Sequence, residues 1–122
     1  MEFMEKQSAI VKHCRARTIY GMIEKGGIFQ SPNMMMGFAR FDKNLGEMIP
    51  HVHPEEGMFV IDCANAFARF GASEDSMGGR TAIKPGMIMW AAEGEWHVFE
   101  FGEGGFLDIV FCLPVGEIVR PE

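Results

Sequence analysis

Glycine and proline recur every few residues along this chain, and this spacing is the strongest limit on what it can fold into. The sequence contains 15 glycines and 6 prolines, and the segments between them are short and rich in Val, Ile, Phe and Met. Beyond the N-terminus no segment keeps the apolar period of about 3.6 residues that an amphipathic helix shows. Short apolar segments bounded by turn residues are typical of strands, so the sequence predicts an all-β fold, either a sandwich or a barrel.

The predicted strands are separated by turn signals such as EKGG at 24–27 and GEGG at 102–105. They cover residues 17–24, 34–41, 49–53, 58–62, 64–70, 81–83, 87–91, 97–101 and 106–113. Residues 1–12 are expected to form a short helix or an edge strand. No repeat or linker interrupts the 122 residues, so a single domain spanning 1–122 is expected.

The charge balance and the apolar runs narrow the choice of partners and location. The formal net charge is −6 and the basic residues are scattered, so nucleic acid is not expected as a partner. No apolar run approaches the roughly 18 residues of a membrane span, so no membrane partner is expected. The N-terminal residues do not resemble a signal peptide, and a cytoplasmic location is therefore expected.

The segment HVHPEEG at 51–57 carries the strongest chemical signal. His51 and His53 are two residues apart on the predicted strand 49–53, so their side chains point to the same face. Two imidazoles placed in this way can share a metal ion. Taken alone, such a pair is more often two exposed polar side chains.

Two adjacent carboxylates follow the histidine pair, and either can reach the same centre. Strand alternation places Glu56 in phase with Met58 at the start of the next predicted strand. We therefore favour Glu56 as a metal ligand and expect Glu55 to be solvated.

The two other histidines lie far from this segment in the sequence. His97 follows a predicted strand and a glycine turn, in AAEGEWH at 91–97, and is a candidate ligand. His13 lies beside lysine and arginine residues near the N-terminus and is expected to be exposed.

The segment that begins at Gly46 resembles the first sequence motif of the cupins, G-x(5)-HxH-x(3,4)-E-x(6)-G. The histidine pair and the glutamate of the motif are matched by His51, His53 and Glu56. The gaps before the first histidine and before the glutamate are each one residue short, and Cys63 stands where the motif ends in glycine. The shortened second gap leaves the choice between the two adjacent carboxylates open.

The segment that ends near His97 resembles the second cupin motif, G-x(5)-PxG-x(2)-H-x(3)-N. Gly94 and His97 match it, whereas Ala92 replaces its proline and Phe101 its asparagine. Over about residues 34–113 the chain is therefore similar to small single-domain cupins of the RmlC-like superfamily. The resemblance implies a jelly-roll barrel (a double-stranded β-helix) and a homodimer, with residues 1–16 forming either a strand exchanged between protomers or a short helix.

The resemblance also implies one divalent transition metal inside the barrel, held by His51, His53, Glu56 and His97. Three neutral imidazoles and one carboxylate around a dication leave a net charge near +1, which favours an anionic small-molecule ligand. Imidazole and carboxylate ligands suit Fe, Mn, Ni, Zn or Cu, so the metal itself stays open.

Four residues are candidates for contact with that ligand. Arg40 is in phase with Met36 on the predicted strand 34–41, and if this phase faces inward Arg40 can clamp a carboxylate. The alternative is an exposed arginine. Met58 and Trp90 can line the pocket, although ordinary core positions are the default for such residues.

The cupin resemblance implies two classes of function. One is a metal-dependent dioxygenase, isomerase, lyase or decarboxylase that acts on a small organic acid, a keto acid or a sugar derivative. The other is a small-molecule-binding or sensor domain without turnover. No residue can be named as a catalytic base, and no nucleophile constellation or phosphate-binding glycine loop is present.

Overall fold

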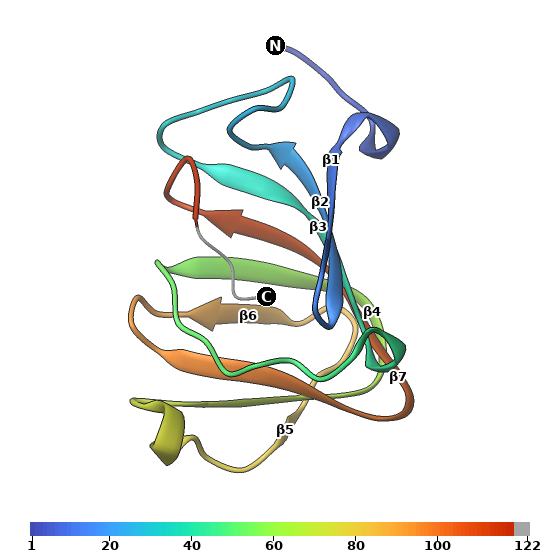
Figure 1. The fold of residues 1–122 in the computed structure, drawn as a ribbon, viewed down its shortest axis with the longest axis vertical. Helices are drawn as coiled ribbons and strands as arrows, with labels where there is room; N and C mark the ends of the chain where they lie inside the picture. Colours follow the sequence, from blue (N-terminus) through green and yellow to red (C-terminus); the bar gives the residue numbers. More distant parts are fainter. Residues whose placement is uncertain (119–122) are drawn as a thin grey trace.

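Strands dominate the computed structural model, which describes residues 1–118 (Figure 1). The strands are β1 (Ile10–Cys14), β2 (Arg17–Ile23), β3 (Met35–Asp42), β4 (Glu56–Gly71), β5 (Thr81–Ala82), β6 (Ile88–Ala91) and β7 (Trp96–Leu113). The helical turns are η1 (Lys6–Ser8), η2 (Lys43–Leu45) and η3 (Glu74–Ser76). Within this described part, none of the helices has the length and hydrophobicity that a membrane span needs. The all-β prediction is confirmed.

Two long strands, β4 and β7, hold the molecule together. They pair antiparallel from Gly57 opposite Cys112 to Gly71 opposite Trp96. Residues 57–64 of β4 and 106–112 of β7 pair in a first layer, whose strand order is β1–β2–β3–β7–β4–β6. Their other halves, residues 66–71 and 96–101, pair in a second layer that has β5 at its edge. Two antiparallel layers that share continuous strands form the expected jelly-roll barrel.

β4 and β7 are each one continuous strand with an internal bulge, whereas the sequence predicted two separate strands in each region. The expected strands 58–62 and 64–70 are one strand, as are 97–101 and 106–113. Asn65 has a φ of 44°, and its side-chain amide donates a hydrogen bond to the Glu103 carbonyl at 2.8 Å. GEGG is therefore a bulge inside β7 and not a turn between two strands. Such bulges bend a strand and increase its twist, so that each long strand can contribute to both layers.

The predicted strand at 49–53 is not a regular strand. One isolated bridge joins His51 to His97 in this connection. Figure 1 shows the connection in green, running from η2 to the start of β4 beside the first half of β7. The connection nevertheless lies against the barrel, because its main chain pairs with β7 at this point.

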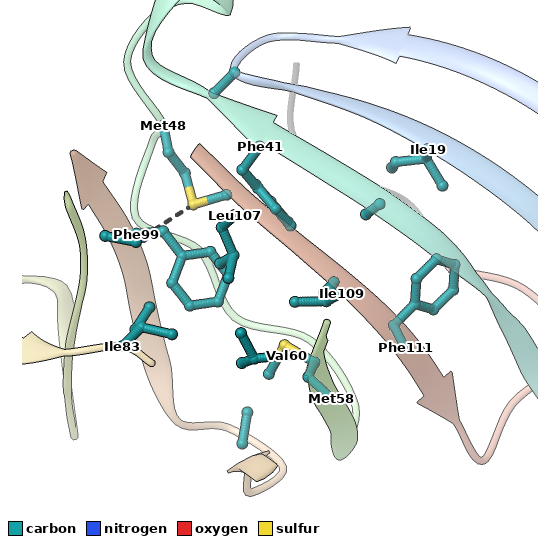
Figure 2. Packing of buried hydrophobic residues seen from close by; sticks show 14 of the residues in the cluster. Ile19, Phe41, Met48, Met58, Val60, Ile83, Phe99, Leu107, Ile109 and Phe111 are labelled. Atoms are coloured by element: carbon teal, nitrogen blue, oxygen red, sulfur yellow. Dashed lines mark hydrogen bonds between the residues drawn. The ribbon is translucent and has the colours of Figure 1, made fainter. Parts of the chain in front are cut away.

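The core lies between the two layers and is built by strand alternation (Figure 2). Its buried side chains include Ile19, Phe41, Met58, Val60, Phe99, Leu107, Ile109 and Phe111. Each such side chain stabilises the fold by about 1.5–3 kcal/mol relative to an exposed one. The sulfur of Met48 also accepts a hydrogen bond from the Phe99 amide at 3.2 Å, which ties the connection before the histidines to β7.

The N-terminal segment contains both a helical turn and an edge strand. η1 precedes β1, and β1 pairs with β2 from Ile10 opposite Gly21 to Cys14 opposite Arg17. The tight turn between them is made by Arg15 and Ala16, and Ala16 has a φ of 69° and is buried. The segment thus packs on the sheet edge of its own chain.

Candidate metal centre

Main-chain pairing brings His51 and His97 together from distant parts of the sequence. The His51 amide donates to the His97 carbonyl at 3.1 Å, and the His97 amide donates to the His51 carbonyl at 3.0 Å. Residues that exchange both hydrogen bonds lie directly opposite each other and project their side chains to the same face. The centroids of the two imidazole rings are 4.5 Å apart.

His53 and Glu56 join this pair from the chain that enters β4. The His53 ring centroid lies 4.8 Å from that of His97 and 5.5 Å from that of His51. One ligand nitrogen from each of the three histidines lies within 4.8 Å of the others, so the group could hold a metal ion. Oε1 of Glu56 lies 3.1 Å from Nε2 of His53, and both side chains are largely buried. The structure therefore brings together the four residues named from the sequence.

Each of the three imidazoles is oriented by a main-chain carbonyl. The Nδ1 atoms face these oxygens at hydrogen-bonding distance: His51 to Ile49 at 2.9 Å, His53 to Pro54 at 2.7 Å and His97 to Glu95 at 3.1 Å. Because a carbonyl oxygen only accepts, each Nδ1 carries the proton and Nε2 is unprotonated in the neutral ring. This is the tautomer in which Nε2 binds a metal.

The contact between His53 and Glu56 also fits a cation. With Nδ1 of His53 as the donor, its Nε2 and Oε1 of Glu56 present lone pairs to each other at 3.1 Å. Two acceptors at this distance repel each other unless a proton or a cation relieves the repulsion. A divalent transition metal binds both imidazole nitrogen and carboxylate oxygen, so the residues present fit one such ion.

Burial keeps two of the histidines uncharged at neutral pH. The pKa of His51 is lowered from 6.5 to about 4, chiefly because burial disfavours the imidazolium, with added repulsion from neighbouring groups that include His97 and Arg17. The pKa of His97 is also lowered, again chiefly by burial. A cation can therefore bind these two imidazoles at neutral pH without displacing a proton from them.

The two adjacent carboxylates have different surroundings. Glu56 lines the same cavity as the three histidines and Met58. Glu55 instead accepts a hydrogen bond from the indole nitrogen of Trp90 at 2.6 Å, and Trp90 is 67% exposed. β4 begins at Glu56, and over its first residues Glu56 is in phase with the buried Met58 and Val60, so Glu56 is the carboxylate that faces the histidines.

Solved structures share this architecture. Fe(II)-HppE with the alternative substrate (S)-1-HPP matches with a TM-score of 0.70 at 11% identity, over 93% of this chain and 60% of that chain. The polyketide cyclase RemF from Streptomyces resistomycificus matches with a TM-score of 0.69 at 16% identity, over 100% of this chain and 88% of RemF. A protein from Planctomyces limnophilus matches with a TM-score of 0.71 at 11% identity, over 96% and 91% of the two chains.

This protein has a cupin fold. The sequence matches no protein-family model and no curated protein, so the likeness is one of structure. The chain also spans only about 60% of the length of HppE.

The cupin barrel contains a cavity of about 40 Å³ beside the histidines. Met58, one of the residues expected to contact a ligand, lines this cavity and is buried. Most of the remaining wall is apolar and includes Ile19, Phe41, Phe99, Ile109 and Phe111. Apolar walls exclude water and strengthen electrostatic interactions inside the cavity.

The other three candidates for ligand contact lie outside this cavity. The inward residues of β3 are Met35, Gly37, Ala39 and Phe41. Met36 and Arg40 therefore face outward. Arg40 is the exposed arginine that the sequence analysis gave as the alternative to an inward one. Arg40 forms an ion pair with Asp108 at 3.2 Å and lies over the Phe106 ring at 4.4 Å. Trp90 is exposed on β6.

A buried arginine that the sequence analysis passed over lines the cavity of the cupin barrel. Arg17 is the first residue of β2, is 6% exposed and lies in the same cavity wall as the histidines. Alternation places it in phase with Ile19, which also lines the cavity. The other phase of RTIYGMI contains Tyr20 and Met22, which are equally apolar, so hydrophobic alternation alone does not reveal which phase faces inward.

Proposed function

We propose that this protein is a metal-dependent enzyme that acts on a small organic acid, a keto acid or a sugar derivative. One divalent transition metal would be held by four side chains: His51, His53, His97 and Glu56. The observation that carries the proposal is the orientation of the three imidazoles, whose Nδ1 atoms face main-chain carbonyls and leave Nε2 for a cation. The Fe(II) and substrate in the HppE crystal, and the cyclase name of RemF, are consistent with an enzyme on this fold.

The histidines, Glu56 and the apolar wall have different roles in the proposed metal site. The three histidines offer neutral nitrogen ligands, and Glu56 supplies one negative charge, so a bound dication keeps a net charge near +1. When bound, such a metal supplies Lewis acidity to an oxygen of the ligand. The apolar wall formed by residues such as Phe99 and Phe111 keeps water away from that oxygen. The site therefore favours a small anionic ligand.

Metal content tests this proposal directly. After separate loading with Fe, Mn, Ni, Zn or Cu, elemental analysis of the purified chain is expected to show close to one ion per chain for at least one of these metals. His51→Ala and His97→Ala are each expected to abolish stoichiometric binding. His13→Ala is the matched control, because His13 lies on β1 and does not line the cavity. A wild-type chain that binds none of these metals, or a His97→Ala chain that binds as well as wild type, would contradict the proposal.

Turnover separates an enzyme from a binding domain. The metal-loaded chain is incubated with a panel of small organic acids, keto acids and sugar derivatives, under air and without oxygen, and products are detected by mass spectrometry. Conversion that is lost in His97→Ala supports the enzyme. Saturable binding without conversion across the panel supports the alternative, a non-catalytic small-molecule-binding or sensor cupin.

We also propose that the protein is a cytoplasmic homodimer in which residues 1–16 contribute to the contact between protomers. The support is the exposure of Met1, Phe3 and Val11 in this segment. Sedimentation equilibrium is expected to give a dimer for the full chain and a monomer after deletion of residues 1–8. A full-length monomer would contradict the dimer, and fractionation of expressing cells tests the location.

A further inference from the structure

A groove of about 370 Å³ adjoins the histidine cavity, which itself has only about 40 Å³. Met58, His97 and Phe99 line both spaces, so the groove reaches a histidine of the candidate metal centre. The cavity has room for roughly three water-sized groups, which is enough for the head of a ligand and not for a body of several carbons. The groove has the size of an ordinary small-molecule pocket, which is about 300–1,000 Å³.

The groove lies between the two layers, at the edge where β6 ends the first layer and β5 ends the second. Its innermost wall consists of buried core residues, among them Met58, Ile83 and Phe99 (Figure 2). Met89 and Ala91 of β6 add further apolar surface. The groove is therefore an apolar passage from the edge of the barrel to the histidines.

Phe70 places an aromatic ring where the groove meets the histidines. It lies directly opposite His97 in the pairing of β4 with β7, and residues in this relation project their side chains to the same face. Phe70 is in phase with the buried Ala66 on β4, yet it is 48% exposed. An aromatic side chain that faces inward and is still half exposed offers a surface that a ligand can cover.

The rim of the groove also exposes large apolar side chains, and its wall offers few hydrogen-bonding groups. Met87, Ile88 and Trp90 are 38%, 71% and 67% exposed. Exposed apolar residues gathered at a concave site mark a place of contact. Within the described part of the chain, the polar side chains that line the groove are those of Thr81, Glu95 and His97. Such a wall favours a hydrocarbon over a hydroxylated body, because buried hydroxyl groups without partners are costly.

We propose that the groove binds the apolar body of a small-molecule ligand whose oxygen-bearing head lies at the histidine cluster. The continuity of the groove with the candidate metal centre supports a small molecule as the occupant. The inference rests on the proposed metal-dependent function and narrows its substrate class to organic acids or keto acids with an aliphatic or aromatic body. Phe70 contacts this body next to the head.

Phe59 provides a matched control for Phe70. Both residues lie on β4 and have similar exposure, 44% for Phe59 and 48% for Phe70. Phe59 stands opposite Val110 on the outer face and does not line the groove. Phe70→Ser removes the ring from the groove, Phe70→Leu keeps an apolar side chain there, and Phe59→Ser removes the ring outside it. Ala68→Leu fills part of the groove, because Ala68 lines it in phase with Phe70.

The experiment uses the full chain loaded with Co²⁺ and the probes acetate, butanoate and hexanoate, which share a carboxylate head and differ in the length of the apolar chain. Calorimetry measures their affinities, and far-UV circular dichroism reports folding. In the wild type each added methylene is expected to strengthen binding about threefold to fourfold, because its burial removes apolar surface from water. Phe70→Ser and Ala68→Leu are expected to reduce the advantage of hexanoate over acetate about tenfold or more. Phe59→Ser should match the wild type, and Phe70→Leu should keep most of the advantage.

Equal binding of acetate and hexanoate by the wild type overturns the inference, as does a hexanoate advantage that Phe70→Ser and Ala68→Leu leave unchanged. A second copy of the chain is the rival occupant. Sedimentation equilibrium tests it, because a dimer that dissociates in Phe70→Ser, in a wild type without a hexanoate advantage, assigns the groove to a contact between protomers.

Failure of the metal proposal is detected separately. Co²⁺ affinity is measured in every variant, and hexanoate is also titrated into the metal-free wild type. NMR then follows the methyl groups of Met58, Met87 and Met89, which line the groove. If the wild type binds no Co²⁺, the metal proposal fails, and the methyl shifts still decide whether the groove takes an apolar body. Methyl signals that hexanoate leaves unmoved overturn the inference, and this measurement decides it even if the groove variants do not fold.

Discussion

Arg17 and Arg40 lie on paired strands, one residue apart in register, and have opposite surroundings. Arg40 stands opposite Thr18, the residue that follows Arg17. The side chain of Arg40 is 46% exposed and pairs with Asp108, whereas Arg17 is buried in the wall of the cavity. The same contrast separates Glu56 from Glu55. The face of the sheet on which a residue lies, and not its charge or its strand, therefore decides whether it belongs to the candidate site.

The largest expected effect contrasts two phenylalanines on the two faces. Phe111 is 3% exposed and lies opposite Met58, whereas Phe59 is 44% exposed and lies opposite Val110. Phe111→Ala is expected to lower the free energy of unfolding by about 3–5 kcal/mol, because it leaves a cavity in the core. Phe59→Ala should cost less than about 1.5 kcal/mol. Urea denaturation followed by circular dichroism measures both values, and equal losses would remove the distinction between the faces.

A smaller effect is expected from the inward histidine His51 as the pH falls. Its pKa is lowered to about 4 in the folded chain, so the unfolded chain takes up a proton first as the pH drops below 6.5. The stability of the metal-free protein is therefore expected to decrease between pH 6.5 and 4, by up to about 3 kcal/mol from this residue. The pH dependence of unfolding measures this loss. His51→Asn should flatten the profile in this range and His13→Ala should not, and a His51→Asn profile like that of the wild type contradicts the expectation.

The two adjacent glutamates provide the next comparison. Glu56→Gln is expected to weaken Co²⁺ binding by about 10- to 100-fold, or about 1.4–2.7 kcal/mol, because the anionic ligand is lost. Glu55→Gln should change it by less than about threefold, because its carboxylate contacts Trp90 and not the histidines. Competition with a chromophoric chelator gives both affinities. The reverse order would place the ligand at Glu55.

The smallest effect is expected on the outer face. Arg40→Ala removes a partly exposed ion pair with Asp108 and is expected to cost about 0.2–1 kcal/mol, decreasing at high salt. Thermal or urea unfolding at low and high salt measures this cost. A loss above about 2 kcal/mol would show that the outer pair stabilises the fold as strongly as an inward residue does.

The all-β barrel could be predicted from the sequence because frequent glycine and proline residues leave only short apolar segments between them. The histidine cluster could be predicted because His51, His53 and His97 occupy the histidine positions of the two cupin motifs. The continuity of β4 could not be predicted. It depends on the φ of 44° at Asn65 and on the contact of its amide with Glu103, which is distant in sequence. Turn residues such as GEGG are equally compatible with a bulge and with a loop.

Which residues of β2 and β3 face the core could also not be predicted from the sequence. In β3 the inward residues include Gly37 and Ala39, which are small, and the outward ones include Met36 and Phe38, which are large and apolar. Hydrophobic alternation therefore points to the wrong face here. The pattern therefore favours Arg40 over Arg17 as an inward residue, whereas the packing of the second layer buries the face that carries Arg17.

The carbonyl oxygens that orient the three imidazoles belong to the main chain. In many sites such an orienting partner is a carboxylate side chain, and a single substitution can remove it. Here the side chains of Ile49 and Glu95 can be exchanged without loss of the acceptor, as long as the backbone keeps its course. The orientation of the three rings therefore does not depend on which side chains occupy positions 49 and 95.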